Sequence, residues 1–391
     1  MPDFTTSKSL FELLVSPLSA YLPKAVEKHK SDWRCRKFTT THHFYLTIFA
    51  QLTGAKSSNA LLEELNDPSC THQQRNLRHF IGFDEHTGLN QSSLSRAFAN
   101  HSYEVWRDCF HQLLELVRKR CPSTQLSDLQ RVLVVDGSLF ACLGRMHWAS
   151  YASTTNKVKG HFFLDLNGVP DKMVLTNGKG NEREVLRTNF KAGYTYVFDR
   201  GYKDYDLFKG LLKAPAHFVT RLASNANYRV IAAKPISQAQ AQLGIIKDET
   251  IELGRHHYSA IAKLRLITFK DSQGQQWQYL TSRTDLTALK VVELYLRRWD
   301  IEFFFRWIKQ HLQLKHWYSQ CENGVLIQLY AALITFLLLK LYAALDEKAR
   351  FKRMNIDFVR WIERHLFGEA ALSQVTNYFH LLALEVTLLQ T

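Results

Sequence analysis

The sequence predicts an α/β protein in which a mixed sheet is preceded and followed by helices. Three observations predict this class. The first 122 residues have helical periodicity, the region after Pro122 contains short β-branched runs that end at turn residues, and helical patterns return near Leu286. With 391 residues, the chain is long enough for two or three structural units.

Residues 1–122 are expected to form a helical, DNA-binding N-terminal domain. FELLVSPL, FYLTIFAQLTG and YEVWRDCFHQLLELVRKR all have the apolar spacing of helices. Within this domain, NQSSLSRAFANHS predicts a helix that starts at Ser92 and Ser93 and carries Arg96 in its first turn. This pattern resembles the second helix of a helix-turn-helix, although a capped surface helix is the favoured interpretation.

Residues 123–224 and 284–324 are expected to form the α/β core. RVLVVDGSLF predicts a strand that stops at Asp136, HFFLDLNGVPDKMVLTNG predicts a hairpin around an Asn-Gly turn, and YTYVFDRGY predicts a strand that ends at Asp199. GNEREVLRTNF and YDLFKGLL predict helices, and HFVTRLA predicts one more strand. A hairpin combined with crossover helices indicates a mixed sheet.

Residues 225–283 are polar and β-like, which predicts a β-rich insertion with strands at IIKDETIELG, LRLITFK and QQWQYLTSR. Residues 325–391 predict a helical C-terminal region. The segment 325–345 is about as long as a membrane span, but Gln328 and Lys340 interrupt it. A buried core helix is therefore the favoured interpretation.

The charge balance indicates a polyanionic partner. The net charge is +14 and the sequence pI is near 9.4, and the usual partner of such a protein is nucleic acid. The sequence shows no basic amphipathic N-terminus and no lipidation signal, so we expect no membrane partner. Six scattered cysteines without a C-x-x-C pair, and the lack of a signal peptide, favour a reduced, cytoplasmic compartment.

Three acids stand out for chemistry. Asp136 and Asp199 are expected at strand ends, where catalytic groups collect at the rim of an α/β sheet, and Glu302 lies within YLRRWDIEFFFRWIK. If the three meet, each pair about 4 Å apart repels by about 4 kcal/mol at an effective dielectric near 20, unless a proton or a cation occupies the cluster. Oxygen ligands select hard ions, so the expected cofactor is Mg²⁺ or Mn²⁺, as two ions that support phosphodiester cleavage.

The helix that carries Glu302 explains why an acid belongs among cations. Placed on one α-helix, four residues project within about 60° of one another: Tyr295, Arg298, Glu302 and Lys309. In this interpretation the carboxylate holds metal while the cations meet phosphates. The alternative for this segment is a salt-bridged, solvent-exposed face.

Each of the other acids also has a structural alternative. Asp136 before a glycine is typical of a turn, and Asp199 could pair with Arg200. Four further acids are rival candidates for the site: Asp165, Glu182, Asp204 and Asp300. Asp165 is expected inside a strand, and Asp300 lies about 160° from Glu302 on a helix, which excludes it from the same site.

These residues resemble the bacterial insertion-sequence transposases of the DDE class, and more narrowly the insertion sequence 4 group. The signature of that group is Tyr, two residues, Arg, three residues, Glu, six residues and Lys, and it is matched without a change in spacing by Tyr295, Arg298, Glu302 and Lys309. The two aspartates of the family match Asp136 in VLVVDGS and Asp199 in FDRGY. A β-rich insertion between the second Asp and the Glu is also a trait of the family.

The resemblance implies an RNase H-like core and cut-and-paste transposition in the bacterial cytoplasm, at the nucleoid. The protein would bind the terminal inverted repeats of double-stranded DNA and pair two ends as a homodimer in a synaptic complex. It would nick the ends with Mg²⁺ and join the free 3′-hydroxyls to target DNA, and related enzymes pass through a hairpin on the transposon end. Asp136, Asp199 and Glu302 would be the catalytic acids and metal ligands.

The DNA contacts implied by the resemblance surround the signature. Tyr295, Arg298 and Lys309 would hold phosphates near the cut. Trp299 would stack on an unpaired base, or would pack in the core instead. The remaining expected contacts are Arg200, Tyr202 and Arg306.

Other functions fit parts of the sequence. A tyrosine recombinase would use a His-x-x-Arg motif such as His72 to Arg75 and would cut DNA without metal. A transposase relic or repressor would bind DNA without cutting it, and a junction resolvase on the same fold would cut without strand transfer. Metal dependence, cleavage and strand transfer separate these alternatives.

Overall fold

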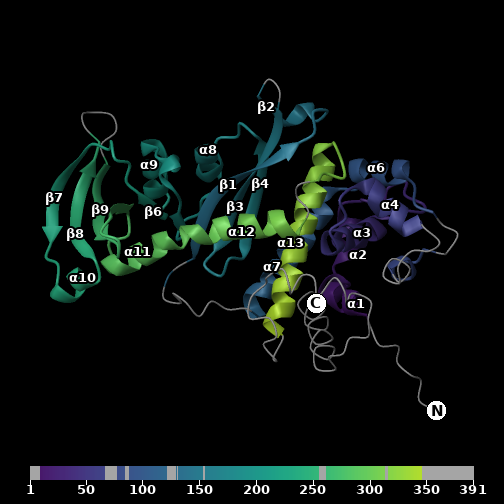
Figure 1. The fold of residues 1–391 in the computed structure, drawn as a ribbon, viewed down its shortest axis with the longest axis horizontal. Helices are drawn as coiled ribbons and strands as arrows, with labels where there is room; N and C mark the ends of the chain where they lie inside the picture. Colours follow the sequence, from purple (N-terminus) through teal and green to yellow (C-terminus); the bar gives the residue numbers. More distant parts are fainter. Residues whose placement is uncertain are drawn as a thin grey trace, which may run out of the picture. The chain divides into compact units, whose positions relative to one another are not determined.

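The structure is a computed structural model that describes residues 9–66, 77–83, 88–120, 129, 131–152, 155–254, 261–312 and 316–345. The chain divides into two compact units, whose elements are labelled in Figure 1. One is a helical unit of Met1–Pro122, Ala141–Trp148 and Arg306–Thr391, and the other is a sheet unit of Ser123–Phe140 and Ala149–Phe305. Two predictions, the His72 to Arg75 motif and the helical tail after residue 345, lie outside the described residues.

The helical unit confirms the predicted helical N-terminal and C-terminal regions. Its complete elements are α1 (Leu10–Val15), η1 (Ser16–Leu18), α2 (Leu22–Lys28), α3 (Thr40–Thr53), α4 (Ser58–Asn66), α6 (Gln91–Asn100), α7 (Tyr103–Arg120), η2 (His147–Ala149, whose last residue falls in the sheet unit) and α13 (Glu322–Leu345). Residues 141–148 belong to this unit because two indoles hold them there. Trp317 Nε1 donates to the carbonyl oxygen of Ala141 at 2.6 Å, and Trp148 Nε1 donates to that of Gln320 at 2.7 Å.

Helix α13 is the predicted core helix. Among the described residues, Glu322–Ala343 is the one helix long and apolar enough to cross a membrane, and 89% of its most apolar window is buried within the protein. It packs on α7 and α3 (Figure 1). Gln328, which interrupts the apolar run, is buried with both ends of its amide satisfied, because it accepts from the Tyr318 amide and donates to the His316 carbonyl oxygen.

Helix α6 begins one residue earlier than predicted. Asn90 is its N-cap and accepts from the Ser93 amide at 2.8 Å, so Ser92 and Ser93 lie inside the first turn. Arg96 is exposed on this helix, while Leu94 and Phe98 are buried. The helix therefore presents a polar face that carries a cation, as both the helix-turn-helix and the capped-helix interpretations require.

The sheet unit contains the predicted mixed sheet. Its described strands are β1 (Val132–Cys142), β2 (Ser150–Ala152), β3 (Thr155–Asp165), β4 (Pro170–Asn177), β5 (Thr195–Val197), β6 (His217–Arg221), β7 (Tyr228–Lys234), β8 (Ile245–Leu253), β9 (Ile261–Lys270) and β10 (Gln276–Thr281). They follow the order β2-β3-β1-β5-β6-β10-β9-β8-β7, and β4 also pairs with β3. The β1/β5 and β5/β6 pairs are parallel, whereas β3/β4 and the pairs from β6 to β7 by way of β10 are antiparallel.

The sheet unit contains the predicted helical segments and also helical elements that the sequence did not predict. They are α8 (Glu182–Asn189), η3 (Arg200–Tyr202), α9 (Tyr205–Lys213), α10 (Gln238–Gln242) and α11 (Ala288–Leu296), together with the first part of α12 (Arg298–His311). The predicted hairpin turn lies between β3 and β4, where Gly168 has a φ of 67°, in the left-handed region that glycine adopts without strain.

The predicted β-rich insertion contains three expected strands and two elements that were not expected, β7 and α10. Its strands are not a separate sheet, because β10 pairs with β6 of the core. The insertion thus extends the sheet that carries the predicted acids. The domain boundaries drawn from the sequence stay predictions.

Three local predictions were wrong. Strand β1 does not stop at Asp136 but continues to Cys142, and β5 ends at Val197, two residues before Asp199. The predicted single helix is divided at Arg297, which caps α11. Its amide donates to the Glu293 carbonyl oxygen at 3.2 Å, and its own carbonyl oxygen accepts from the Asp300 amide at 2.9 Å, so the chain tightens there before α12 begins.

Candidate active site

The register of the sheet brings Asp136 and Asp199 together. Val134 of β1 is paired with Val197 of β5 in a parallel ladder, and each aspartate follows its paired valine by two residues. Neighbouring strands lie about 4.8 Å apart, and residues two apart share a face of the sheet. The two carboxylates therefore lie at the same level of adjacent chain segments, although neither ends its strand.

Asp136 is half-buried in the middle of β1, and its Oδ1 accepts from the Gly137 amide at 2.7 Å. Burial, together with the negative charges of Glu182 and Asp199, raises the pKa of Asp136 to about 7, although the Gly137 hydrogen bond and the Arg298 cation act to lower it. The turn role proposed for Asp136 is excluded by its position inside the strand. A carboxyl group in this setting favours a nearby cation when it ionises.

Asp199 is held by the turn that it begins. Its Oδ1 accepts from the Gly201 amide at 2.8 Å and caps η3, and its carbonyl oxygen accepts from the Thr220 hydroxyl at 3.1 Å. This arrangement differs from the alternative of an ion pair with Arg200, whose side chain is exposed. The side chain of Asp199 is partly exposed, so it is available as a ligand.

Glu302 lies in the second turn of α12 and is bound by Arg298. The Arg298 guanidinium donates to Glu302 Oε1 at 2.7 Å and is only 9% exposed. Burial acts to lower the pKa of Arg298, but the Glu302 hydrogen bond and the charges of Tyr295, Glu302 and Asp136 outweigh it and raise that pKa. The positive charge of Arg298 thus interacts with the carboxylates of both Glu302 and Asp136.

Glu182 is the rival acid that the structure places in this group. At the first position of α8, its Oε1 accepts from Lys159 Nζ at 2.8 Å. A Cβ atom at Gly137 would come within 2.7 Å of the same oxygen, so the glycine next to Asp136 makes room for Glu182. The sequence offered one signal for this residue, an acid at the start of a helix that follows the hairpin.

The other rival acids have structural roles. Asp165 ends β3 rather than lying inside it, and it accepts from the amides of Asn167 and Val169 in the hairpin turn. Asp204 caps α9 and binds Arg187 at 2.9 Å. Asp300 binds Arg297 at 3.2 Å, as its expected position away from Glu302 allows. These three acids are therefore not part of the site.

The predicted DNA contacts on α11 and α12 differ in exposure. Tyr295 is buried against Tyr279, with ring centroids 4.8 Å apart, and burial raises its pKa. Trp299 is 50% exposed and carries the Arg298 guanidinium 4.4 Å from its ring centroid, so the core-packing alternative does not hold. Arg306 is exposed and Lys309 is half-buried, and both belong to the helical unit although they continue α12.

Tyr202 was expected to contact DNA, and the structure corrects this expectation. Its side chain is fully buried in a core cluster with Phe198 and Phe208. Burial raises its pKa, and the charges of Glu182, Asp136 and Asp199 act in the same direction. Tyr202 therefore belongs to the buried core near these acids.

The acids suit a hard divalent cation in donor type, since all offer carboxylate oxygens. Their present arrangement is looser than a closed metal site. Among the described residues, the group of three donors whose ligand atoms all lie within 4.8 Å of one another is Asp32, Cys35 and His101, in the helical unit.

Comparison with known proteins gives one family for this region. The model described as "Transposase DDE domain" matches residues 127–338, which include the three predicted acids, and a model of a domain of unknown function matches residues 6–83. A putative transposase, y4zB, of Sinorhizobium fredii is 33% identical over 203 residues, which are 51% of this chain and 57% of that protein.

Two further relatives match over more of their length. The probable transposase for insertion sequence element IS5377 of Geobacillus stearothermophilus is 26% identical over 77% of this chain and 80% of its own. The putative transposase for insertion sequence element IS4SA of Synechocystis is 24% identical over 69% of this chain and 80% of its own. The chain thus spans little more than half of the first relative and about four fifths of the other two.

Proposed function

The chain belongs to the family of transposases with a DDE domain, and from this premise we propose that it is a divalent-metal-dependent, cut-and-paste DNA transposase of the insertion sequence 4 group. One observation carries the proposal. The β1/β5 register sets Asp136 and Asp199 at the same level, and Arg298 connects Glu302 to Asp136. The unbroken Tyr-Arg-Glu-Lys spacing supports the narrower group.

Asp136, Asp199 and Glu302 would hold Mg²⁺ or Mn²⁺, two ions in the proposed mechanism. When bound, such ions supply charge stabilisation at the scissile phosphate and activate water or a 3′-hydroxyl. The protein's own contribution is to hold the carboxylates in place. The Gly137 amide orients Asp136, the Gly201 amide orients Asp199, and Arg298 orients Glu302 until DNA and metal engage.

Arg298 is proposed to change partners during the reaction. Its guanidinium is buried and already donates to a carboxylate oxygen, and a phosphate oxygen can accept the same kind of hydrogen bond. When Glu302 turns to the metal, the freed donors of Arg298 can bind the phosphate next to the cut. Tyr295 would position Arg298 from the buried side, while Trp299 would stack on an unpaired base.

The remaining parts of the proposal concern the fold and the assembly. A hairpin next to parallel strands and a crossover helix supports an RNase H-like core with a β-rich insertion at 225–283. We propose that residues 1–122 bind the terminal inverted repeats, with α6 and its exposed Arg96 as one contact, and that Arg200, Arg306 and Lys309 add phosphate contacts. Pairing of two DNA ends requires at least a homodimer, acting at the bacterial nucleoid.

The test is cleavage of a labelled inverted-repeat end, taken from the DNA that flanks the gene, by the purified full chain. With Mg²⁺, the wild-type protein should cut and Asp199→Ala should not, while both bind the end. The matched control is Asp300→Asn, a carboxylate that pairs with Arg297 outside the site, which should keep cleavage.

Each alternative gives a different result in the same assay. Binding without any cutting by the wild-type protein would refute the enzyme and favour a relic or repressor. Cleavage that persists in EDTA and leaves protein attached to DNA would favour a tyrosine recombinase. Cutting without transfer of a precut end into plasmid DNA would favour a resolvase.

A further inference from the structure

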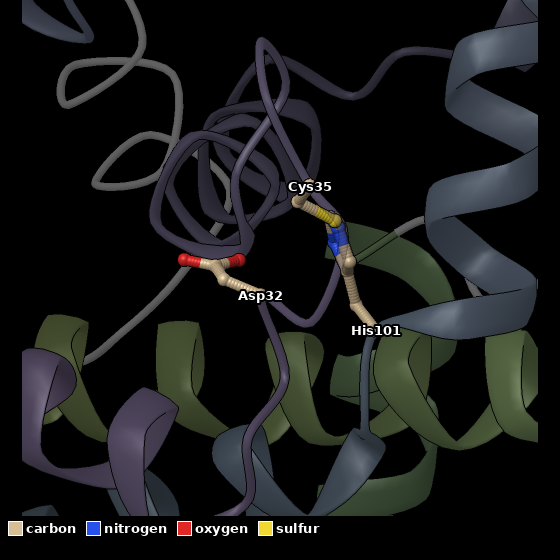
Figure 2. Close-up of side chains that lie close together, drawn as sticks. All are labelled: Asp32, Cys35 and His101. Carbon is tan, nitrogen blue, oxygen red and sulfur yellow. Dashed lines mark hydrogen bonds between the residues drawn. The ribbon is translucent and has the colours of Figure 1, made fainter.

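The helical unit contains a group of metal-binding side chains far in sequence from the predicted acids. Asp32 and Cys35 lie in the loop between α2 and α3, and His101 follows the last residue of α6. One oxygen, one sulfur and one nitrogen from these residues all lie within 4.8 Å of one another. Figure 2 shows the three side chains, contributed by two separate segments of the chain.

We propose that Asp32, Cys35 and His101 form a Zn²⁺ site, with a fourth position open to water, that ties the α2–α3 loop to the end of α6. The mixed donor set favours Zn²⁺ over Mg²⁺, because thiolate and imidazole are ligands of zinc and oxygen-only sets are ligands of magnesium. The site is distinct from the DDE acids in both position and chemistry.

The distances are close to those that zinc imposes. Cys35 Sγ lies 3.3 Å from His101 Nε2. Two such ligands around one tetrahedral zinc are separated by about 3.6 Å, so only a small outward shift is needed. Asp32 Oδ1 accepts from the Thr40 amide at 2.6 Å, which fixes the carboxylate and leaves its second oxygen to act as the third ligand.

The surroundings of His101 are those of a zinc-bound imidazole. Its Nδ1 lies 3.1 Å from Nδ1 of His43, and both rings are buried. A histidine that binds zinc donates a hydrogen bond from its second ring nitrogen to a neighbouring acceptor, which fixes the ring and its tautomer.

Access to the site comes from the loop. Between the two loop ligands, Trp33 is 75% exposed, and Cys35 and Asp32 are themselves partly exposed. A turn in which the Cys35 amide donates to the Asp32 carbonyl oxygen at 2.9 Å brings these two ligands to the same side. An ion and its water can therefore reach the donors without unfolding of the helices.

Cobalt substitution tests the site, because Co²⁺ bound by thiolate gives a charge-transfer band that oxygen-only sites do not give. The purified full chain, stripped with a chelator, is titrated with Co²⁺ and then with Zn²⁺. We expect the band to saturate at one Co²⁺ per chain and to be bleached by Zn²⁺. Cys35→Ser should abolish the band, whereas Asp32→Asn should retain it with about tenfold weaker binding or more.

Cys321 provides the matched control, since it is a partly exposed thiol in the same unit but outside the group. Cys321→Ser should bind Co²⁺ as the wild-type protein does. An unchanged band in Cys35→Ser, or no band in the wild-type chain, would overturn the proposal and leave Cys35 and His101 as a hydrogen-bonded pair.

A measurement on the wild-type protein avoids dependence on the folding of variants. Zn²⁺ should slow alkylation of Cys35 by iodoacetamide at least tenfold, as followed by mass spectrometry of its peptide, and should leave the rate at Cys321 unchanged. Equal rates at Cys35 with and without Zn²⁺ would contradict the site. Neither experiment uses cleavage, so the result is independent of the proposed transposase activity.

Discussion

Asp136 ionises against its surroundings, because burial and the charges of Glu182 and Asp199 raise its pKa to about 7 from the ordinary value of 3.8. Between these two values the folded state keeps a proton that the unfolded chain has released. The free energy of unfolding therefore falls as the pH rises from about 4 to about 7. Above that range Asp136 is ionised in the folded protein, and the free energy of unfolding stays lower. A cation at the site would relieve the same cost.

Asp136→Asn should therefore stabilise the metal-free protein at pH 8. The gain in unfolding free energy should be at most about 4 kcal/mol, which corresponds to a shift of about three pKa units, and structural relaxation in the wild-type protein will make the gain smaller. Urea unfolding in EDTA measures the gain, which should vanish below pH 4, where both side chains are uncharged. Mg²⁺ should raise the melting temperature of the wild-type protein at pH 8 and not that of the variant. A gap that persists at pH 4 would refute the electrostatic explanation.

Glu302 combines a proposed metal ligand with the partner of a buried cation. Glu302→Gln keeps an oxygen acceptor for Arg298, whereas Glu302→Ala would leave a buried guanidinium without its carboxylate partner. We expect both variants to lose cleavage and to retain binding of the DNA end, and the Gln variant to keep the wild-type stability. Gel-shift and cleavage assays separate the two functions. Loss of DNA binding by the folded Gln variant would count against the role of Glu302 as a metal ligand.

Gly137 and Glu182 can be tested as a pair. Gly137→Ala places a methyl group 2.7 Å from Glu182 Oε1, which should push that side chain away from Lys159 and cost about 1–3 kcal/mol. Adding Glu182→Ala removes the clash, so the double variant should recover most of that loss relative to Glu182→Ala alone. Urea unfolding of the four proteins gives the coupling, and additive effects would show that the two residues do not meet.

At the scale of elements, the predicted strands and helices were largely observed, and the errors have physical causes. An Asp-Gly pair usually marks a turn, but β1 continues through it because the small glycine accommodates Glu182 from α8, a contact that sequence spacing does not show. Arg297 divides the predicted helix although no glycine or proline is present, because its side chain and carbonyl both bind Asp300. Tyr202 was expected to contact DNA, yet its side chain is buried in the core.

The grouping of the candidate site residues was partly predictable, because part of it depends on local sequence patterns. Strand patterns placed Asp136 within a strand segment and Asp199 just after another, and helical spacing grouped Arg298 with Glu302. Which strands pair, and in what register, depends on contacts between distant segments, so the match of Val134 with Val197 could not be predicted. The position of Glu182 depends on that tertiary arrangement as well.

The β-rich insertion is joined to α11 by a buried ion pair whose contribution can be measured. Arg265 of β9 donates to both oxygens of Asp248 of β8, and its remaining nitrogen donates to the Leu286 carbonyl oxygen just before α11. Asp248→Ala leaves this buried cation unpaired and should cost about 3–5 kcal/mol of unfolding free energy. The control Arg229→Ala removes an exposed pair with Glu252 and should cost less than about 1 kcal/mol. Similar losses in both variants would show that burial of the pair has no energetic weight.

At the scale of the whole molecule, helix α12 carries the signature from one unit into the other. Glu302 belongs to the sheet unit and Lys309 to the helical unit, and the division falls between Phe305 and Arg306. The proposed metal ligand Glu302 and the proposed phosphate contact Lys309 therefore belong to different units of the chain, while Arg298 belongs to the same unit as Glu302. The excess of 14 positive charges would supply a general attraction to DNA in the proposed function.

The salt dependence of DNA binding can show whether Lys309 makes a phosphate contact of its own or only adds to the general attraction of a positively charged protein. The logarithm of the binding constant falls with the logarithm of the salt concentration by about 0.9 for each phosphate neutralised. Burial lowers the pKa of Lys309, and a bound phosphate would act in the opposite direction by stabilising the charged ammonium. Lys309→Ala should therefore weaken binding of the inverted-repeat end and reduce the slope by about 0.9, because one released counterion is lost. The control is Lys213→Ala, an exposed lysine in the last turn of α9, which should leave the slope unchanged. An equal slope for Lys309→Ala and the wild-type protein would show that the final residue of the signature binds no phosphate, and the assignment of α12 as a DNA-contacting helix would then depend on Arg298, Trp299 and Arg306 alone.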